Sequence, residues 1–366
     1  MIISIGSLLL IAILVFISLD GTFLARKYDS VWSDKYIGGL ENEQSKMIAY
    51  GIRAASSHNT QPWLVKYISS DTIELYADMD KALHVVDGDY KQLLMSQGAF
   101  IESYKLGAFK YGYEADIIYS IPNFDEKMPL IATIKVREEA NMGIVDAISS
   151  STYDVAYPEG DTDLKKTLDE CIAEFPGFNY TIVESGPDVE KLEGFLLEGT
   201  IIESKDEAAA KELLDVFRWT EWQKNDYRYG LSLNTMPGLL KPFIQPIMQS
   251  SSKNLEAFGD GGIAQFKYRL DKQTRYILIR SDNPGSLEYL YSGQIYQKLI
   301  FEVSGYDLRP AMQALEDFEA MRSLNMKFRQ EYGDDGEVVL IIGMQEKTGK
   351  SANSNPRHLV EDIIIQ

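Results

Sequence analysis

Residues 54–63 read Ala-Ala-Ser-Ser-His-Asn-Thr-Gln-Pro-Trp, and the rest of the chain is organised around this stretch. An apolar-periodic segment (45–55) before it predicts a helix, and an extended run (64–68) after it predicts a strand. Six consecutive polar side chains are more than a minimal turn needs. Hydroxyls, an imidazole and two amides form hydrogen bonds without carrying charge, so they suit a flat, uncharged, hydrogen-bonding ligand. The alternative is a structural turn that Trp63 anchors in the core.

The composition limits the class of protein. With 366 residues, the chain is long enough for two domains or one large one. A net charge of −19, from 36 basic and 55 acidic residues, argues against a nucleic-acid partner, because phosphate binding needs a basic face. The single Cys171 excludes an intramolecular disulfide. His58, His84 and His358 lie far apart in the sequence, so we predict no metal site.

The N-terminus carries an apolar run. Residues 2–19 are uncharged and almost wholly apolar, and eighteen residues at a helical rise reach roughly 27 Å. No basic region precedes the run and no small-x-small cleavage site follows it, which disfavours a cleaved signal peptide. We therefore predict a single-pass N-terminal transmembrane helix within residues 1–27. Arg26, Lys27 and Lys35 follow the run, so the positive-inside rule predicts a cytoplasmic body.

Beyond residue 28 the pattern predicts two rounds of helices and strands. Each round contains a long, largely apolar helix, at 90–111 and at 287–304. Gly98 and Gly293 occupy these helices at the same spacing from the extended segment that follows, which suggests a fused dimer. Residues 229–262 interrupt the pattern with three prolines and a glycine cluster, yet they are rich in apolar residues. We interpret them as a lid-like insertion, with a helical hairpin on the surface as the alternative.

Four motifs in order resemble one family. Residues 54–63 resemble the APSxHNTQPW segment of twin-domain, Acg-like nitroreductases, a subgroup of the FMN-dependent nitroreductase superfamily. Residues 92–99 are similar to that family's R-x-L-x-x-x-x-GA helix start, with Lys91-Gln92 in place of the usual Arg. Residues 292–294 resemble the AGQ that opens its second central helix, and residues 355–362 its closing PRRPLED segment. The resemblance extends from about residue 41 to the end.

This resemblance implies an α+β fold with two tandem nitroreductase-like halves, 28–140 and 141–366, that form an intrachain pseudo-dimer. In the superfamily, FMN binds at the interface between halves. By position, Ser57, Asn59 and Gln61 would contact the ring and ribityl chain, and Arg357 would approach the phosphate.

The implied activity is that of a membrane-anchored oxidoreductase. It would pass hydride from NAD(P)H through the flavin to a small-molecule acceptor, such as a quinone or a nitroaromatic compound. We single out no catalytic side chain, because the chemistry would belong to the cofactor.

One departure from the family pattern supports a second hypothesis. The family's second half usually opens with an RxTxR motif that holds the phosphate, but residues 149–154 here read Ser-Ser-Ser-Thr-Tyr-Asp. Hydroxyls do not match a bidentate guanidinium. The chain would then be a catalytically degenerate protein that binds or sequesters flavin or another small ligand. Residues 175–180, the second-half counterpart of the polar stretch, lack its amide-rich set of side chains, so we expect at most one working site per chain.

Overall fold

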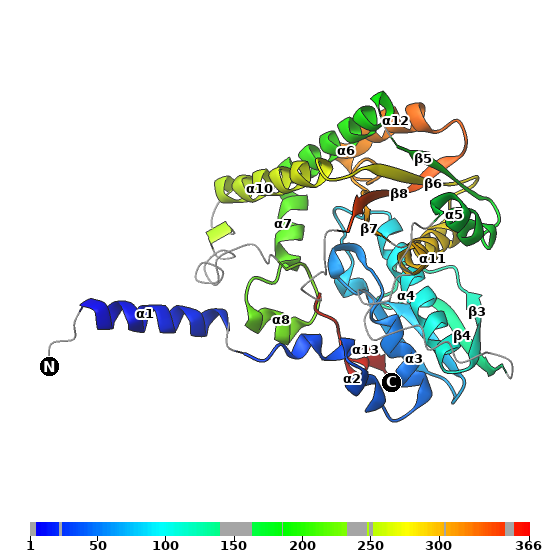
Figure 1. Cartoon of the computed structure of the whole chain (residues 1–366), viewed down its shortest axis with the longest axis horizontal. Coiled ribbons are helices and arrows are strands. Elements are labelled where there is room, and N and C mark those ends of the chain that lie inside the picture. The colour runs from blue at the N-terminus through cyan, green and yellow to red at the C-terminus, as the bar shows by residue number, and fades with distance from the viewer. Residues whose placement is uncertain are drawn as a thin grey trace.

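The computed structural model describes residues 5–21, 24–139, 163–184, 186–232, 247–248, 252–303, 305–347 and 355–366. Within them the chain is α+β, as predicted, with two sheets and helices packed around and between them (Figure 1). The strand order is β3-β4-β2-β1-β9 in the first sheet and β5-β6-β8-β7 in the second. The strands are β1 Trp63–Tyr67, β2 Thr72–Ala77, β3 Tyr113–Tyr119, β4 Leu130–Glu138, β5 Phe178–Val183, β6 Arg275–Ser281, β7 Tyr306–Pro310, β8 Glu337–Glu346 and β9 Ile364–Ile365.

The helices occupy both rounds of the chain and the segment between them. The α-helices are α1 Ile5–Asp20, α2 Asp34–Gly38, α3 Glu43–Gly51, α4 Lys91–Lys110, α5 Leu164–Ala173, α6 Pro187–Lys205, α7 Glu207–Val216, α8 Glu221–Tyr227, α10 Ser252–Leu270, α11 Ser286–Glu302, α12 Arg322–Tyr332 and α13 Val360–Ile363. The 3-10 helices are η1 Lys27–Trp32, η2 Ser57–Asn59, η3 Met79–Lys81 and η4 Glu319–Met321.

The end of the chain belongs to the first sheet. Most strand pairs in both sheets are antiparallel, but β9 pairs with β1 in parallel, with Val65 opposite Ile364 and Lys66 opposite Ile365. Because β1 directly follows residues 54–63, this pairing draws the segment that begins at Asn355 alongside the polar stretch. The two motifs therefore lie together in the fold, although almost 300 residues separate them.

The two central helices, α4 and α11, lie between the sheets and pack directly against each other (Figure 1). Glycines allow the close contact. A Cβ on Gly98 would lie 1.9 Å from the carbonyl oxygen of Leu290, and a Cβ on Gly293 would lie 1.9 Å from that of Met95. A real Cβ does not approach a backbone oxygen this closely, so only glycine fits at either position. The paired glycines in the sequence thus mark the helix crossing.

Capping side chains set where several helices begin. Asn42 precedes α3, and its Oδ1 accepts a hydrogen bond from the Ser45 amide at 2.7 Å. Thr220 and Gln223 form a capping box at the start of α8. Each cap satisfies amides that have no partner within the helix. These short-range rules are why most predicted helices appear near their expected positions.

The predicted N-terminal transmembrane helix is wrong. Helix α1 has 16 residues, about 24 Å at the helical rise, whereas a hydrocarbon core is about 30 Å thick. In the part of the chain that the structure describes, no helix has both the length and the hydropathy that a membrane crossing requires. The predicted membrane location, with a cytoplasmic body, depended on this helix and is therefore also wrong.

Some predicted segments lie outside the residues that the structure describes, and one observed strand differs from the prediction. Residues 143–149, for which the sequence also predicts a helix, and residues 149–154 lie outside the described residues, as does most of 229–251 within the lid-like insertion. The described end of that insertion is α10, which packs alongside α6 (Figure 1). The sequence predicts an extended segment after the second central helix but does not delimit strand β7. Its five residues do alternate apolar and charged side chains, but the strand is short and ends at Pro310, which weakens the pattern.

Candidate functional site

A cavity of about 390 Å³ lies where the two central helices meet. Its walls come from the polar stretch, α4, α10, α11, β8, the end of β7 with the residues after it, Leu231 and the segment that begins at Asn355. Small-molecule sites in proteins commonly have volumes of about 300–1,000 Å³. The cavity is therefore the candidate functional site.

The polar stretch adopts a strained backbone at this cavity. His58, Asn59 and Gln61 have φ values of 47°, 56° and 51°, in the left-handed region that non-glycine residues seldom occupy. Gln61 also precedes Pro62, which ordinarily restricts a residue to extended conformations. Each such residue costs on the order of 1 kcal/mol and persists only where its surroundings enforce it. Trp63, fully buried against Phe100 with ring centroids 5.3 Å apart, anchors the end of the stretch.

Ser57 lines the cavity and attaches the stretch to α4. Its Oγ donates to Gln92 Oε1 at 2.8 Å, and its amide donates to Ser96 Oγ at 3.0 Å. Gln92 and Ser96 also line the cavity. Gln92 stands where the resembled family usually has arginine, so this wall of the site is uncharged and hydrogen-bonding.

Asn59 lines the cavity, but its side chain already holds neighbouring backbone. Its Nδ2 donates to Gly230 O at 3.0 Å and to Pro356 O at 3.1 Å. Its Oδ1 accepts a hydrogen bond from the Arg357 guanidinium. The amide therefore joins the polar stretch to the C-terminal segment.

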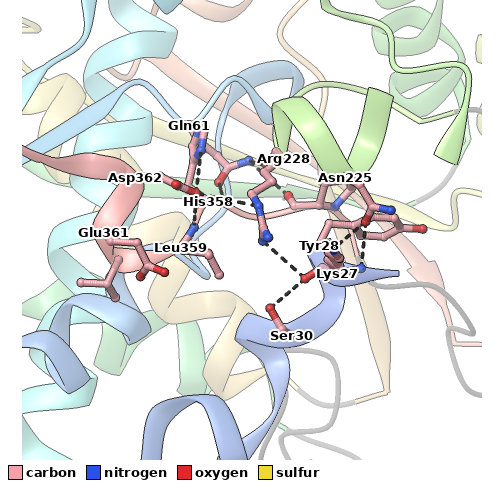
Figure 2. A network of polar contacts seen from close by, with 12 residues as sticks. Lys27, Tyr28, Ser30, Gln61, Asn225, Arg228, His358, Leu359, Glu361 and Asp362 are labelled. Atoms are coloured by element: carbon pink, nitrogen blue, oxygen red, sulfur yellow. Dashed lines mark hydrogen bonds and ion pairs between the residues drawn. The ribbon is translucent and has the colours of Figure 1, made fainter. Parts of the chain in front are cut away.

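Gln61 lies behind the cavity wall, fully buried, and is not among the residues that line the cavity. Its Nε2 donates to Arg228 O at 3.0 Å and Pro356 O at 3.1 Å, and its Oε1 accepts from the His358 amide at 3.0 Å. Figure 2 shows this side chain beside the C-terminal segment, with Arg228 continuing the network to Lys27 O at 3.4 Å. Gln61 thus positions three backbone segments around the site.

Arg357 is the predicted site residue that comes from the far end of the chain. It lines the cavity, although its side chain is largely buried. Nη2 donates to Ala54 O at 3.1 Å, and the guanidinium lies over the Trp32 ring at 5.3 Å. The structure therefore places Ser57, Asn59 and Arg357 at one cavity, and Gln61 lies behind its wall.

Two further arginines line the cavity and were missed by the sequence reasoning. Arg269 comes from the end of α10 and Arg309 from β7. Burial lowers the pKa of Arg269, and the charge of Arg309 lowers it further, while Glu203 opposes the change. Among the described residues no carboxylate forms an ion pair with Arg269, and its buried Nε has no hydrogen-bond partner there. Arg309, by contrast, donates from Nε and Nη2 to Asp307 Oδ2 at 2.9 Å and 2.6 Å. The cavity wall thus carries two guanidinium groups, which favour binding of an anion.

Burial, reinforced by Arg269, lowers the pKa of His58 to about 4. The imidazole is therefore neutral at physiological pH and adds hydrogen-bonding capacity to the cavity wall without adding charge. This neutral state agrees with the uncharged character expected for the polar stretch.

Acidification should destabilise the wild-type protein more than a His58→Gln variant. An unfolded histidine titrates near 6.5, whereas native His58 titrates at about 4. Between these values the unfolded state binds the proton and the native state does not. Stability that is present above about pH 6.5 is therefore lost as the pH falls towards 4. We expect the loss between pH 7 and pH 5 to be smaller in the variant by about 2 kcal/mol. Urea unfolding at both pH values measures this, and an equal loss in both proteins would contradict it.

The second-half counterpart of the polar stretch lies elsewhere. Asn179, on β5, is exposed and donates to Asp335 O at 3.2 Å. It is not among the residues that line the cavity. The polar groups at this cavity from the first round of the chain are those of residues 54–63 and of α4.

Comparison of the fold with solved structures finds a match to the crystal structure of a "putative nitroreductase" from Anabaena variabilis. The match covers 76% of this chain and 69% of that chain, with 13% sequence identity and a TM-score of 0.32. No protein-family model matches the sequence, and no curated protein matches it. A TM-score this low does not establish a shared fold. The functional assignment therefore rests on the motifs and on the site itself.

Proposed function

We propose that this protein binds FMN in the cavity between α4 and α11 and acts as a nitroreductase-type oxidoreductase built as an intrachain pseudo-dimer. The observation that carries the proposal is the composition of the cavity wall. Uncharged hydrogen-bonding groups of the polar stretch meet arginines from three separate elements at the crossing of two glycine-containing central helices. The twin-domain motifs in the sequence support the same conclusion.

The residues present fit each part of FMN. Met95, Ala99 and Tyr296 provide apolar surface for a ring system. Ser57, Gln92, Ser96 and Ser292 offer hydroxyls and an amide for ring edges and a polyol chain. Arg269, Arg309 and Arg357 supply positive charge for a phosphate dianion, a role that the sequence reasoning assigned to Arg357 alone.

When bound, the flavin would accept hydride from NAD(P)H and pass it to a small electrophilic acceptor such as a quinone or nitroaromatic compound. The protein's contribution is to orient the ring and to exclude water from it. Ser57, held by Gln92 and Ser96, offers its hydroxyl to the ring edge or polyol. Gln61 keeps Asn59 and Arg357 in place by fixing the backbone of Pro356 and His358.

A second candidate function is binding or sequestration of a flavin or other small ligand without turnover. One observation favours it: the amides of Asn59 and Gln61 are already engaged by Gly230, Pro356, Arg228 and His358. In this second function, Asn59 and Gln61 set the shape of the cavity and take no part in a reaction.

Purification in the dark followed by an absorbance spectrum separates these functions. FMN that copurifies or binds on titration, and loses its visible absorbance under anaerobic NADH or NADPH, supports the oxidoreductase. Bound flavin that neither nucleotide reduces supports the binding function. Failure to bind FMN at any concentration tested would remove the first proposal.

Loss of an arginine in the cavity should weaken FMN binding much more than riboflavin binding. The two ligands differ only in the phosphate, and a charge-assisted contact to it contributes about 1.5–3 kcal/mol. Arg269→Gln and Arg309→Gln should therefore each reduce FMN affinity about ten- to a hundredfold and leave riboflavin affinity within about twofold. Flavin fluorescence titration measures both constants.

Arg329→Gln is the matched control, because Arg329 is an exposed residue of α12 that pairs with Glu337 at 2.9 Å, away from the cavity. It should leave both affinities unchanged. An equal loss of FMN and riboflavin affinity in the Arg269 and Arg309 variants would mean that these residues do not bind the phosphate.

A further inference from the structure

Glu316 is a buried carboxyl group that lines the cavity. It lies between β7 and η4, and only 5% of its surface is exposed. Its backbone oxygen accepts a hydrogen bond from Asn325 Nδ2 at 3.3 Å. Its side chain, by contrast, has no hydrogen bond or ion pair with any described residue, and Oε2 is buried without a partner. Buried polar groups are nearly always paired, so an unpaired carboxyl at a cavity wall calls for a functional explanation.

The groups around Glu316 determine its charge. Glu203 on α6 and Asp87 before α4 are also buried carboxyls. Burial raises the pKa of Glu316 well above its ordinary range, and the charges of Glu203 and then Asp87 raise it further. The nearby cavity wall also carries the cations Arg269, Arg309 and Arg357 and the neutral His58.

An ionised Glu316 would be expensive. A buried carboxylate without a hydrogen bond or ion pair loses its hydration and recovers nothing in exchange, a penalty of several kcal/mol. Protonation removes that penalty. A neutral carboxylic acid, however, carries an O–H donor that itself needs an acceptor. Glu316 lines the cavity, so a molecule bound there can supply that acceptor.

We propose that Glu316 is a protonated carboxylic acid that donates a hydrogen bond to a carbonyl oxygen or ring nitrogen of the molecule bound in the cavity. Only the identity of that molecule as a flavin or quinone rests on the proposed function. Glu316 therefore selects ligands with a neutral acceptor at this point, as buried neutral acids do in other active sites. Raising the pH until Glu316 ionises places a negative charge against the same acceptor and expels the ligand.

Infrared spectroscopy of the ligand-free protein tests the protonation state. At pH 7 the wild-type minus Glu316→Gln difference spectrum should contain the C=O stretch of a protonated carboxyl group. Glu203→Gln should shift ionisation of Glu316 to lower pH, because it removes the neighbouring negative charge that raises the pKa of Glu316 most. Asp317→Asn is the matched control: Asp317 is the next residue, but its side chain is half exposed, so its spectrum should retain the band. Absence of the band from the wild-type difference spectrum would overturn the proposal.

Ligand titration tests the donated hydrogen bond. FMN, riboflavin and menadione should each be tried at pH 6 and pH 9 against wild type, Glu316→Gln and Glu316→Leu. Wild type should lose at least tenfold in affinity at the higher pH for any probe that binds. The glutamine variant, which keeps a donor, should bind within about threefold of wild type at pH 6 and show no such pH dependence. The leucine variant should bind about fivefold to tenfold more weakly at pH 6.

The outcomes separate this inference from the proposed function. Equal affinity of all three proteins at both pH values would overturn the role of Glu316 while leaving flavin binding intact. Binding of menadione but not of either flavin, with the expected dependence on Glu316, would remove the FMN proposal and keep the donor. If no probe binds to the wild-type protein, both the proposed function and donation to such a ligand fail, and the infrared band alone decides the protonation state.

Discussion

A Gly98→Ala variant should be about 3 kcal/mol less stable than the wild-type protein. The added methyl carbon would lie 1.9 Å from the carbonyl oxygen of Leu290, and a backbone oxygen on a packed helix cannot rotate away as a side chain can. Helices α4 and α11 must therefore separate along their whole contact. Gly293→Ala should have a similar effect, because its methyl would meet the Met95 carbonyl oxygen at the same distance.

Urea unfolding measures these losses. The double variant should lose clearly less than the sum of the single losses, since both changes act on one helix crossing. FMN affinity should fall as well, because Met95 and Gly293 line the cavity. Gly194→Ala is the control: Gly194 lies within α6 and a Cβ there meets nothing within 4 Å, so alanine should stabilise the protein by about 0.5–1 kcal/mol. A Gly98→Ala protein as stable as wild type would show that the helices do not cross at this contact.

Gln61→Ala should also reduce stability by about 3 kcal/mol. The change leaves Arg228 O and the His358 amide without their partner in a buried place, and each unsatisfied group costs about 1–3 kcal/mol. It also leaves an alanine with a φ of 51°, which an L-residue adopts only at a cost. Gln61→Glu, of the same size, should be at least as harmful, because it sets a carboxylate against the carbonyl oxygens of Arg228 and Pro356.

The damage from Gln61→Ala should be greatest at the C-terminal segment. Amide hydrogen exchange should become faster for Ile364 and Ile365 and for their β1 partners. Exchange in the strands of the second sheet should change little. Asn179→Ala serves as the control, since Asn179 makes one exposed hydrogen bond and its loss should cost less than about 0.5 kcal/mol. Unchanged exchange in residues 355–366 would contradict the clamping role of Gln61.

Both predictions concern contacts that shape the same cavity. The glycine crossing sets how closely the central helices approach, and Gln61 sets where the C-terminal segment lies. Together they bring Arg357 to the polar stretch. A ligand that binds the cavity would therefore stabilise the helix crossing and the C-terminal segment at the same time.

The sequence by itself determined features that depend on neighbours along the chain. Hydrophobic periodicity placed α4 within one residue of its observed ends, at Lys91–Lys110. The polar composition of residues 54–63 identified one wall of the cavity. The matching glycines pointed to two equivalent helices, since each glycine lies within a long apolar segment. In each case short-range geometry connects the residue pattern to the structure.

Only the tertiary structure decided how these parts combine. Arg269, Arg309 and Glu316 come from α10, β7 and the loop after β7, and no sequence motif connects them; the cavity does. Gln61 looked like a ligand-binding amide, but it is fully buried, and its side chain is bonded to Pro356 O and the His358 amide of the C-terminal segment. The apolar N-terminal run suggested a membrane span, yet its helix ends after 16 residues. Long-range packing and exact helix length are properties of the folded chain, because they depend on contacts between residues that are distant in sequence.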